Sequence, residues 1–201
     1  MRHFNKGQAP ESFLKWTDKN SNKSWDDFGK EASDIKDTLK NTLLEEQGYL
    51  CCYCECRVGG EKECHIEHFK PKALFHRERF SYNNLHISCT KQGDKIRCGH
   101  KKDNTFNNDI ISPLEEDCDS HFSYKLSGEI EGKDKRGKET IDTCNLKSKA
   151  LIEMRKALID TFIYYDDDLR EELVKDHLDY SKKELGEFYS MIEFFHKNGY
   201  I

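Results

Sequence analysis

The sequence lacks any apolar run that approaches the length of a membrane span. Its first residues, MRHFNKGQAPESF, lack the apolar segment and the cleavage site of a secretory signal. It also lacks internal repeats and low-complexity tracts. We therefore expect a cytoplasmic protein with no membrane association. Hydrophobic and charged residues each make up 35% of the 201 residues, and since Leu, Ile, Phe and Tyr recur throughout, a folded chain is expected.

An excess of positive charge is also absent. The formal net charge of −5 argues against a protein that binds nucleic acid nonspecifically through its whole surface. The charge is uneven, however. Residues 65–102 carry nine Lys and Arg against three Asp and Glu, whereas residues 163–193 carry four against ten. The first segment is a basic island, and a nucleic-acid backbone is a plausible partner for it.

Cysteine is abundant, with nine residues, and in a reducing compartment this favours metal binding or buried thiols over disulfides. Cys51 and Cys54 form a C-x-x-C pair, the spacing with which a tight turn offers two thiolates to one zinc ion. Cys89 and Cys98 form a second, wider pair, so the four together predict a structural Zn²⁺ site. Redox chemistry remains an alternative for the set. The other cysteines are treated as alternative ligands (Cys52, Cys56 and Cys64) or as core residues (Cys118 and Cys144).

The stretch HIEHFKPK at 65–72 suggests chemistry beyond a structural metal. Glu67 offers a carboxylate, which holds a hard divalent cation. His68 offers an imidazole with an ordinary pKa near neutrality, which can remove a proton from an attacking water. Alone, a Glu-His pair is most often a surface dipeptide. Its position between the two cysteine pairs favours metal-assisted hydrolysis of a phosphodiester instead.

The periodicity predicts an α+β protein in three parts: an N-terminal helical lead-in over 1–48, a zinc-supported core over 49–113, and a hairpin with C-terminal helices over 114–201. Apolar residues at helical spacing predict a helix over 31–47 with Gly48 as its C-terminal cap. Residues 120–132 predict a hairpin with a two-residue turn at Ser127-Gly128. Further helical stripes predict one helix over 138–165 and one or two over 169–196. The core has few apolar residues, so we expect zinc to stabilise it.

The ordered motifs resemble the HNH endonucleases. They comprise C-x-x-C, E-H-x-x-P from Glu67 to Pro71, Asn84-Leu85, and a last cysteine in C-x-x-x-K from Cys98 to Lys102. The segments LLEEQGYLCCYCE, YNNLHISC and TIDTCNLKSKALIEMRK extend the resemblance to PtuB, the nuclease subunit of Septu anti-phage systems, which also occurs beside some retrons. The resemblance covers residues 8–160. It implies a ββα-metal core, in which a two-strand hairpin and a helix surround a divalent metal with zinc as support, flanked by N- and C-terminal helices.

Carried onto this sequence, the resemblance implies His68 as general base, Glu67 as the acidic metal ligand and Asn84 as the residue that orients the catalytic loop. The last ligand departs from the pattern, because Gly99 stands where many members have His or Asn. His100 is the expected substitute, with Mg²⁺ or Mn²⁺ as the catalytic metal, and His65 is expected to assist. The alternatives to His100 are Asp103, Asn104, Asn107 and Asn108. The cations expected to bind nucleic acid are Lys70, Lys72, Arg77, Lys101 and Lys102.

The resemblance also implies partners. The expected substrate is DNA or RNA, and the expected partner is an ABC-type or SMC-like ATPase subunit similar to PtuA, with a retron nucleic acid as a further possible component. Two other readings stay open at this point. The chain could be a zinc-dependent module that binds nucleic acid without cutting it. It could also be an adaptor for the ATPase partner with a decayed catalytic site, which the glycine at position 99 favours.

Overall fold

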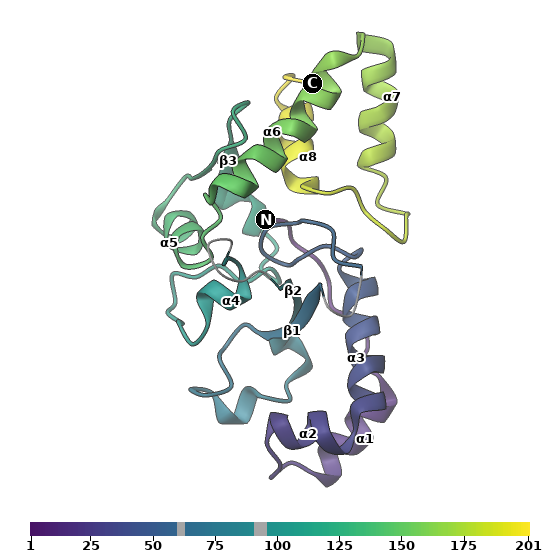
Figure 1. Ribbon diagram of the computed structural model, residues 1–201, viewed down its shortest axis with the longest axis vertical. Helices are drawn as coiled ribbons and strands as arrows, with labels where there is room; N and C mark the ends of the chain where they lie inside the picture. The colour runs from purple at the N-terminus through teal and green to yellow at the C-terminus, as the bar shows by residue number, and fades with distance from the viewer. Residues whose placement is uncertain (60–62, 91–95) are drawn as a thin grey trace.

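The computed structural model describes residues 1–59, 63–90 and 96–201, and this part of the chain is a mixed arrangement of helices and two small antiparallel sheets (Figure 1). The expected α+β class is therefore confirmed. Helices α1, α2 and α3 lie at one end, helices α6, α7 and α8 at the other, and the β1–β2 pair lies between them. Among the described residues, no helix combines the length and the apolar character that a membrane span requires.

The N-terminal lead-in consists of three helices, α1 (Glu11–Lys19), α2 (Trp25–Glu31) and α3 (Ser33–Glu46). Helix α2 begins with a capping box, in which the Ser24 hydroxyl accepts from the Asp27 amide and the Asp27 carboxylate accepts from the Ser24 amide. Phe13 and Phe28 pack against one another inside the bundle, both fully buried. Helix α3 matches the helix expected over 31–47, and Gly48 follows it with a φ of 61°.

The central sheet pairs β1 (Cys64–His68) with β2 (Leu85–Cys89), so that Cys64 lies opposite Cys89 and His68 opposite Leu85. All five residues of β2 are buried. Gln47, just after α3, completes the hydrogen bonds at the outer edge of β2. Its side chain accepts from the Ile87 amide at 2.7 Å and donates to the Ile87 carbonyl at 3.0 Å. The N-terminal helices are thereby attached to the strand that carries Cys89.

The second sheet pairs β3 (Phe122–Tyr124) with β4 (Ile130–Gly132), which confirms a hairpin within 120–132. The expected two-residue turn is wrong. The amide of Lys125 donates to the carbonyl of Glu129, so three residues close the loop, and the last of them, Gly128, has a φ of 87°. A glycine with positive φ at the end of a three-residue loop is a common hairpin closure.

The C-terminal part contains α5 (Lys135–Thr143), α6 (Lys149–Tyr164), α7 (Asp167–His177) and α8 (Tyr189–Lys197). The single helix expected over 138–165 is therefore wrong, while two helices over 169–196 were among the expectations. The chain breaks between α5 and α6 because Asn145 adopts a φ of 50° and Leu146 turns into the core. Asn tolerates this conformation better than most residues. The buried Arg155 guanidinium then donates to the Leu146 carbonyl at 2.9 Å.

Glu55 attaches the C-terminal helices to the cysteine-rich turn at 51–56. Its carboxylate accepts from the Ser190 amide at 2.8 Å and from the Ser190 hydroxyl at 2.7 Å, at the start of α8. The amino group of Met1 lies 3.2 Å from the same carboxylate. Burial opposes the charge of Glu55, but this ammonium and the Ser190 bonds lower its pKa. Three distant segments therefore meet at one buried carboxylate.

We expect Gly128→Ala to destabilise the protein by more than about 1 kcal/mol, because an alanine resists the positive φ and its Cβ would collide with the Ile152 carbonyl oxygen of α6. Gly59→Ala is the matched control, since a Cβ there meets no atom within 4 Å. Urea unfolding of both variants measures the effect. Equal midpoints for the two variants would contradict the close approach of the hairpin to α6.

Candidate active site and metal centre

The structure brings together the four cysteines expected to bind zinc. The Sγ atoms of Cys51, Cys54, Cys89 and Cys98 all lie within 4.8 Å of one another, and all four residues are buried. The sulfurs of Cys54 and Cys89 are 3.9 Å apart. A tetrahedral zinc with Zn–S bonds of about 2.3 Å places its sulfurs about 3.8 Å apart, so the residues present fit this ion. Among the described residues, no other His, Cys, Asp or Glu group meets this criterion.

Local backbone structure explains how the four sulfurs converge. Leu50 and Arg57 form an isolated bridge, and the turn between them presents Cys51 and Cys54. Cys89 ends β2, and Cys98 precedes the short helix α4 (Gly99–Lys102) with a φ of 57°. The Cys89 amide donates to Cys51 Sγ at 3.3 Å. Burial opposes ionisation of Cys51, but hydrogen bonds with the surrounding thiols lower its pKa well below the ordinary value, which favours the thiolate that zinc requires.

The other cysteines are buried but lie outside the four-sulfur group. Cys56 lies beside it, and its sulfur is 3.7 Å from the guanidinium of Arg97, which is also buried. Burial opposes the charge of Arg97, whereas the neighbouring sulfurs favour it and raise its pKa. A cation here offsets the negative charge that four thiolates create. Cys118 and Cys144 are fully buried in the core, as expected.

Strand β1 carries the candidate catalytic residues. Because successive side chains of a strand alternate between its faces, His65 and Glu67 project to the same side. His65 Nε2 lies 3.3 Å from Glu67 Oε2. His68 ends the strand and turns toward helix α2, where the Trp25 ring meets it edge-on at 4.5 Å between centroids. These four residues line one cleft of about 340 Å³ together with Gly99 and His100.

Glu67 is buried and its two oxygens have different partners. Oε1 accepts from the Lys102 ammonium at 3.0 Å and from the Tyr53 hydroxyl at 3.3 Å. Oε2 faces His65 and the cleft. Burial opposes the charge, but the bond with His65 and the Lys102 ammonium lower the pKa of Glu67, so the carboxylate is ionised. One charged oxygen is therefore oriented toward the cleft.

His68 is oriented by a single backbone contact. Its Nε2 lies 3.0 Å from the carbonyl oxygen of Arg79, which can only accept, so Nε2 carries the proton and Nδ1 is the basic nitrogen. Burial lowers the pKa of His68 to about 4, although the Arg79 carbonyl partly opposes this shift. The sequence-based assumption of a pKa near neutrality is therefore corrected. The imidazole is neutral, as a proton acceptor must be.

Asn84 lies away from the cleft residues and holds the loop that follows β1. Its side-chain oxygen accepts from the Lys70 amide at 2.7 Å, and its side-chain amide donates to the carbonyls of Lys70 and Glu78. Arg79, whose carbonyl orients His68, follows directly after Glu78. Asn84 thus holds the loop whose Arg79 carbonyl contacts His68, and its role in orienting the catalytic loop stays a prediction.

Gly99 and His100 lie at the start of α4, against β1. The His100 ring stacks on the His65 ring, with centroids 4.5 Å apart. A side chain at position 99 has no room, because a Cβ would collide with the Glu67 carboxylate and lie 2.9 Å from His65 Nε2. Asp103 and Asn104 also line the cleft, whereas Asn107 bonds to Glu139 and Asn108 does not line it.

The cations predicted to bind nucleic acid differ in position. Lys72 lines the cleft and pairs with Asp26, and Lys70 pairs with Glu78. Lys101 and Arg77 are exposed, but Arg77 lines a separate cleft. The expectation for Lys102 is corrected. Its side chain is fully buried, and its ammonium donates to Glu67 and to the His68 carbonyl, since the short helix turns it inward.

Sequence reasoning missed two residues of the site, Trp25 and Tyr53. Neither was named among the site residues, because their contacts with β1, Trp25 with His68 and Tyr53 with Glu67, follow no local sequence pattern. The position of Tyr53 inside the C-x-x-C pair was the only available signal, since that turn must approach the metal-binding strand.

No family model matches the chain. It is 34% identical over 142 residues to "Retron Vc95 putative HNH endonuclease" of Vibrio cholerae serotype O1 biovar El Tor, covering 65% of this chain and 67% of that protein. The chain belongs to the HNH endonuclease family of this retron protein. It is also 34% identical over 131 residues to "Septu protein PtuB" of Bacillus thuringiensis, covering 63% of this chain and 48% of that protein. A third HNH relative, from retron Ec83 of Escherichia coli, is 30% identical over 152 residues, covering 69% of this chain and 52% of the relative. The chain thus spans about half the length of the last two relatives.

We expect one zinc ion per chain, and Cys89→Ser to lose it together with much of the stability of the region around β2. Structural zinc in small domains contributes about 10–16 kcal/mol of apparent binding free energy, which is coupled to folding. Elemental analysis and thermal unfolding measure both effects. Cys118→Ala is the control, because it removes a buried thiol outside the four-sulfur group. Zinc retained at parental level in Cys89→Ser would contradict this assignment.

Proposed function

We propose that this protein is a metal-dependent HNH endonuclease that hydrolyses phosphodiester bonds of DNA or RNA, and that it is the nuclease of an anti-phage complex with an ABC-type or SMC-like ATPase subunit. The observation that carries the proposal is the pair formed by an ionised Glu67 and a neutral, oriented His68 at the end of one strand. The names of the retron and Septu relatives support the defence context.

The arrangement of β1, β2 and α4 supports an HNH core over about residues 49–113. The two strands pair antiparallel, and α4 lies against the face of β1 that carries His65 and Glu67. The four-cysteine group holds the end of β2 and the start of α4 together. The boundaries at residues 48 and 113, which separate this core from the N-terminal and C-terminal parts, are also part of the proposal.

In the proposed mechanism His68 Nδ1 accepts the proton of the attacking water, with the ring fixed by the Arg79 carbonyl. Glu67 Oε2, His65 and His100 would hold a divalent cation, which when bound stabilises negative charge on the phosphate and on the leaving oxygen. The chemistry of these donors suits such an ion, since Lys102 engages only Oε1 and His65 Nδ1 is buried with no hydrogen-bond partner in the described part of the chain, but their ligand atoms do not all lie within 4.8 Å of one another in this structure. Imidazole ligands favour Mn²⁺ over Mg²⁺.

The adaptor reading rested on the missing side chain at position 99. The packing supports another interpretation. Any side chain there would displace the Glu67 carboxylate and the His65 ring. In this proposal His65 and His100 together supply the metal ligand that the residue after the last cysteine supplies in many HNH endonucleases. Gly99 is then required for the site and is not a sign of its decay.

We expect His68→Ala to lower cleavage by roughly 10²–10⁴-fold, the usual effect of losing a general base. Purified protein, with and without the ATPase subunit, would be incubated with Mn²⁺ and plasmid DNA, phage DNA or total tRNA. His3→Ala is the control, since His3 does not line the cleft and its ring bonds to the Asn5 side chain. Cleavage by His68→Ala at the parental rate would refute the assignment of the base.

We expect His65→Ala and His100→Ala each to weaken Mn²⁺ binding and cleavage together, with partial rescue of cleavage at higher Mn²⁺. Asp103→Ala tests the remaining acidic residue of the cleft and should leave both unchanged. Calorimetric titration of Mn²⁺ into the three variants measures the affinity without depending on activity. If His100→Ala kept the parental affinity for Mn²⁺ and Asp103→Ala lost it, the metal ligand would be Asp103 and not His100.

A further inference from the structure

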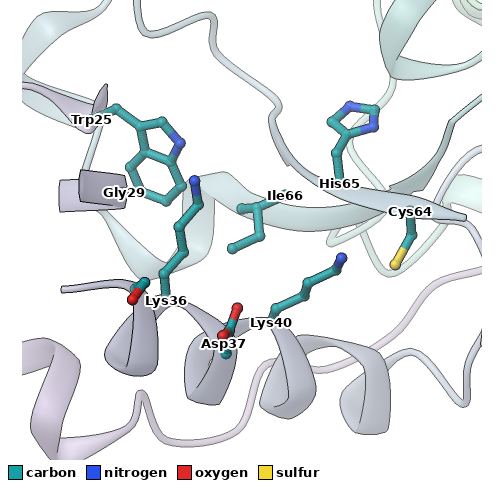
Figure 2. Close-up of a pocket in the computed structure, with 9 residues that line it drawn as sticks. Trp25, Gly29, Lys36, Asp37, Lys40, Cys64, His65 and Ile66 are labelled. Carbon is teal, nitrogen blue, oxygen red and sulfur yellow. The ribbon is translucent and has the colours of Figure 1, made fainter. Parts of the chain in front are cut away.

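A second cleft adjoins the candidate active site. It has a volume of about 460 Å³ and lies between α2, α3 and β1 (Figure 2). Trp25, His65 and Ile66 line both this cleft and the one that contains Glu67 and His68. A chain-like ligand whose reacting group lies at the end of β1 would therefore extend directly into the second cleft.

Two lysines from α3 point across this cleft toward β1. Lys36 and Lys40 are one helical turn apart, on the same face of the helix, and Figure 2 shows both side chains rising from α3 toward the strand. Both are partly buried. The Lys36 ammonium lies 5.8 Å from the centre of the Trp25 ring, and within the described residues no carboxylate forms an ion pair with it. Asp37 is the one carboxylate among the lining residues, and it is exposed.

Gly29 lies beside the Lys36 ammonium. A Cβ at this position would lie 2.9 Å from Lys36 Nζ. Gly29 lies inside α2, where glycine destabilises a helix by about 0.5–1 kcal/mol relative to alanine. The observation that points to an anion is the Lys36 ammonium in the cleft, which forms no ion pair with a carboxylate among the described residues.

We infer that this cleft binds the sugar-phosphate backbone of the nucleic-acid strand next to the phosphate that is cleaved, with Lys36 and Lys40 contacting its phosphates. The inference rests on the proposed function and extends it. Of the cations expected to bind nucleic acid from the sequence, Lys70, Lys72 and Lys102 all pair with carboxylates. In a chain with a net charge of −5, attraction of a phosphate backbone depends on local groups such as Lys36.

The test measures binding in the His68→Ala background, so that the probe stays intact. Fluorescence anisotropy with a labelled single-stranded DNA, its duplex and an RNA of the same sequence is recorded over a range of salt concentrations. Two lost phosphate contacts reduce the slope of log K against log salt by about 1.4 for a single strand and about 1.8 for a duplex. We expect this reduction for Lys36→Gln/Lys40→Gln, and half of it for Lys36→Gln alone, which leaves the contact of Lys40 with Cys64 in place.

The matched control is Lys149→Gln/Lys156→Gln on α6, which removes the same charge at the other end of the molecule and should keep the parental slope. If the Lys36 variants kept the parental affinity and salt slope, the cleft assignment alone would be overturned. An equal decrease in the α6 control would have the same consequence. Absence of nucleic-acid binding by the parent, together with absence of Mn²⁺-dependent cleavage, would overturn the cleft and the proposed function together.

Discussion

The convergence of four thiols at one point is the constraint on which the rest of the structure depends. Cys51, Cys54, Cys89 and Cys98 join the turn after α3, the end of β2 and the start of α4. From Cys51 to Lys102 the described residues form two five-residue strands, two three-residue 3₁₀ helices and a helix of four residues. A two-stranded hairpin is marginally stable by itself in water. One ion bound by the four thiolates would cross-link these short elements and fix the position of β1 and of the candidate catalytic side chains on it.

The surroundings of Glu67 explain two features that look anomalous in the sequence. Lys102 belongs to a basic run, yet it is buried, because one oxygen of the buried carboxylate requires a cation. Removing either partner would leave an uncompensated buried charge. Gly99 lacks a ligand atom, yet its small size is what admits the His65 ring and the Glu67 carboxylate to the same space. Both features belong to one packing arrangement, in which one oxygen of Glu67 is neutralised by protein and the other is turned toward the cleft.

The sequence predicted those parts of the fold that depend on local pattern or on the chemistry of one residue type. Thiol spacing identified the four-cysteine group, and the apolar period identified α3. What it did not predict depends on contacts between distant segments. The break before α6 follows from the left-handed Asn145 and from a carbonyl that Arg155 satisfies. The contact of Trp25 with His68 joins α2 to β1, and no local sequence pattern predicts it.

Burial of His68 has two effects: it lowers the stability of the folded protein at acidic pH, and it keeps the imidazole in the neutral form that can accept a proton. In the unfolded chain the imidazole takes up a proton near its ordinary pKa of 6.5, whereas in the folded state burial lowers the pKa to about 4. Between these values the unfolded state binds more protons, so this residue contributes to a loss of stability as the pH falls from about 6.5 to about 4. Above this range the ring stays neutral without cost, and the Arg79 carbonyl fixes which nitrogen is basic. The Trp25 ring packs edge-on against the imidazole and lines both clefts, so a strand bound in both would run past one of the groups that bury the base.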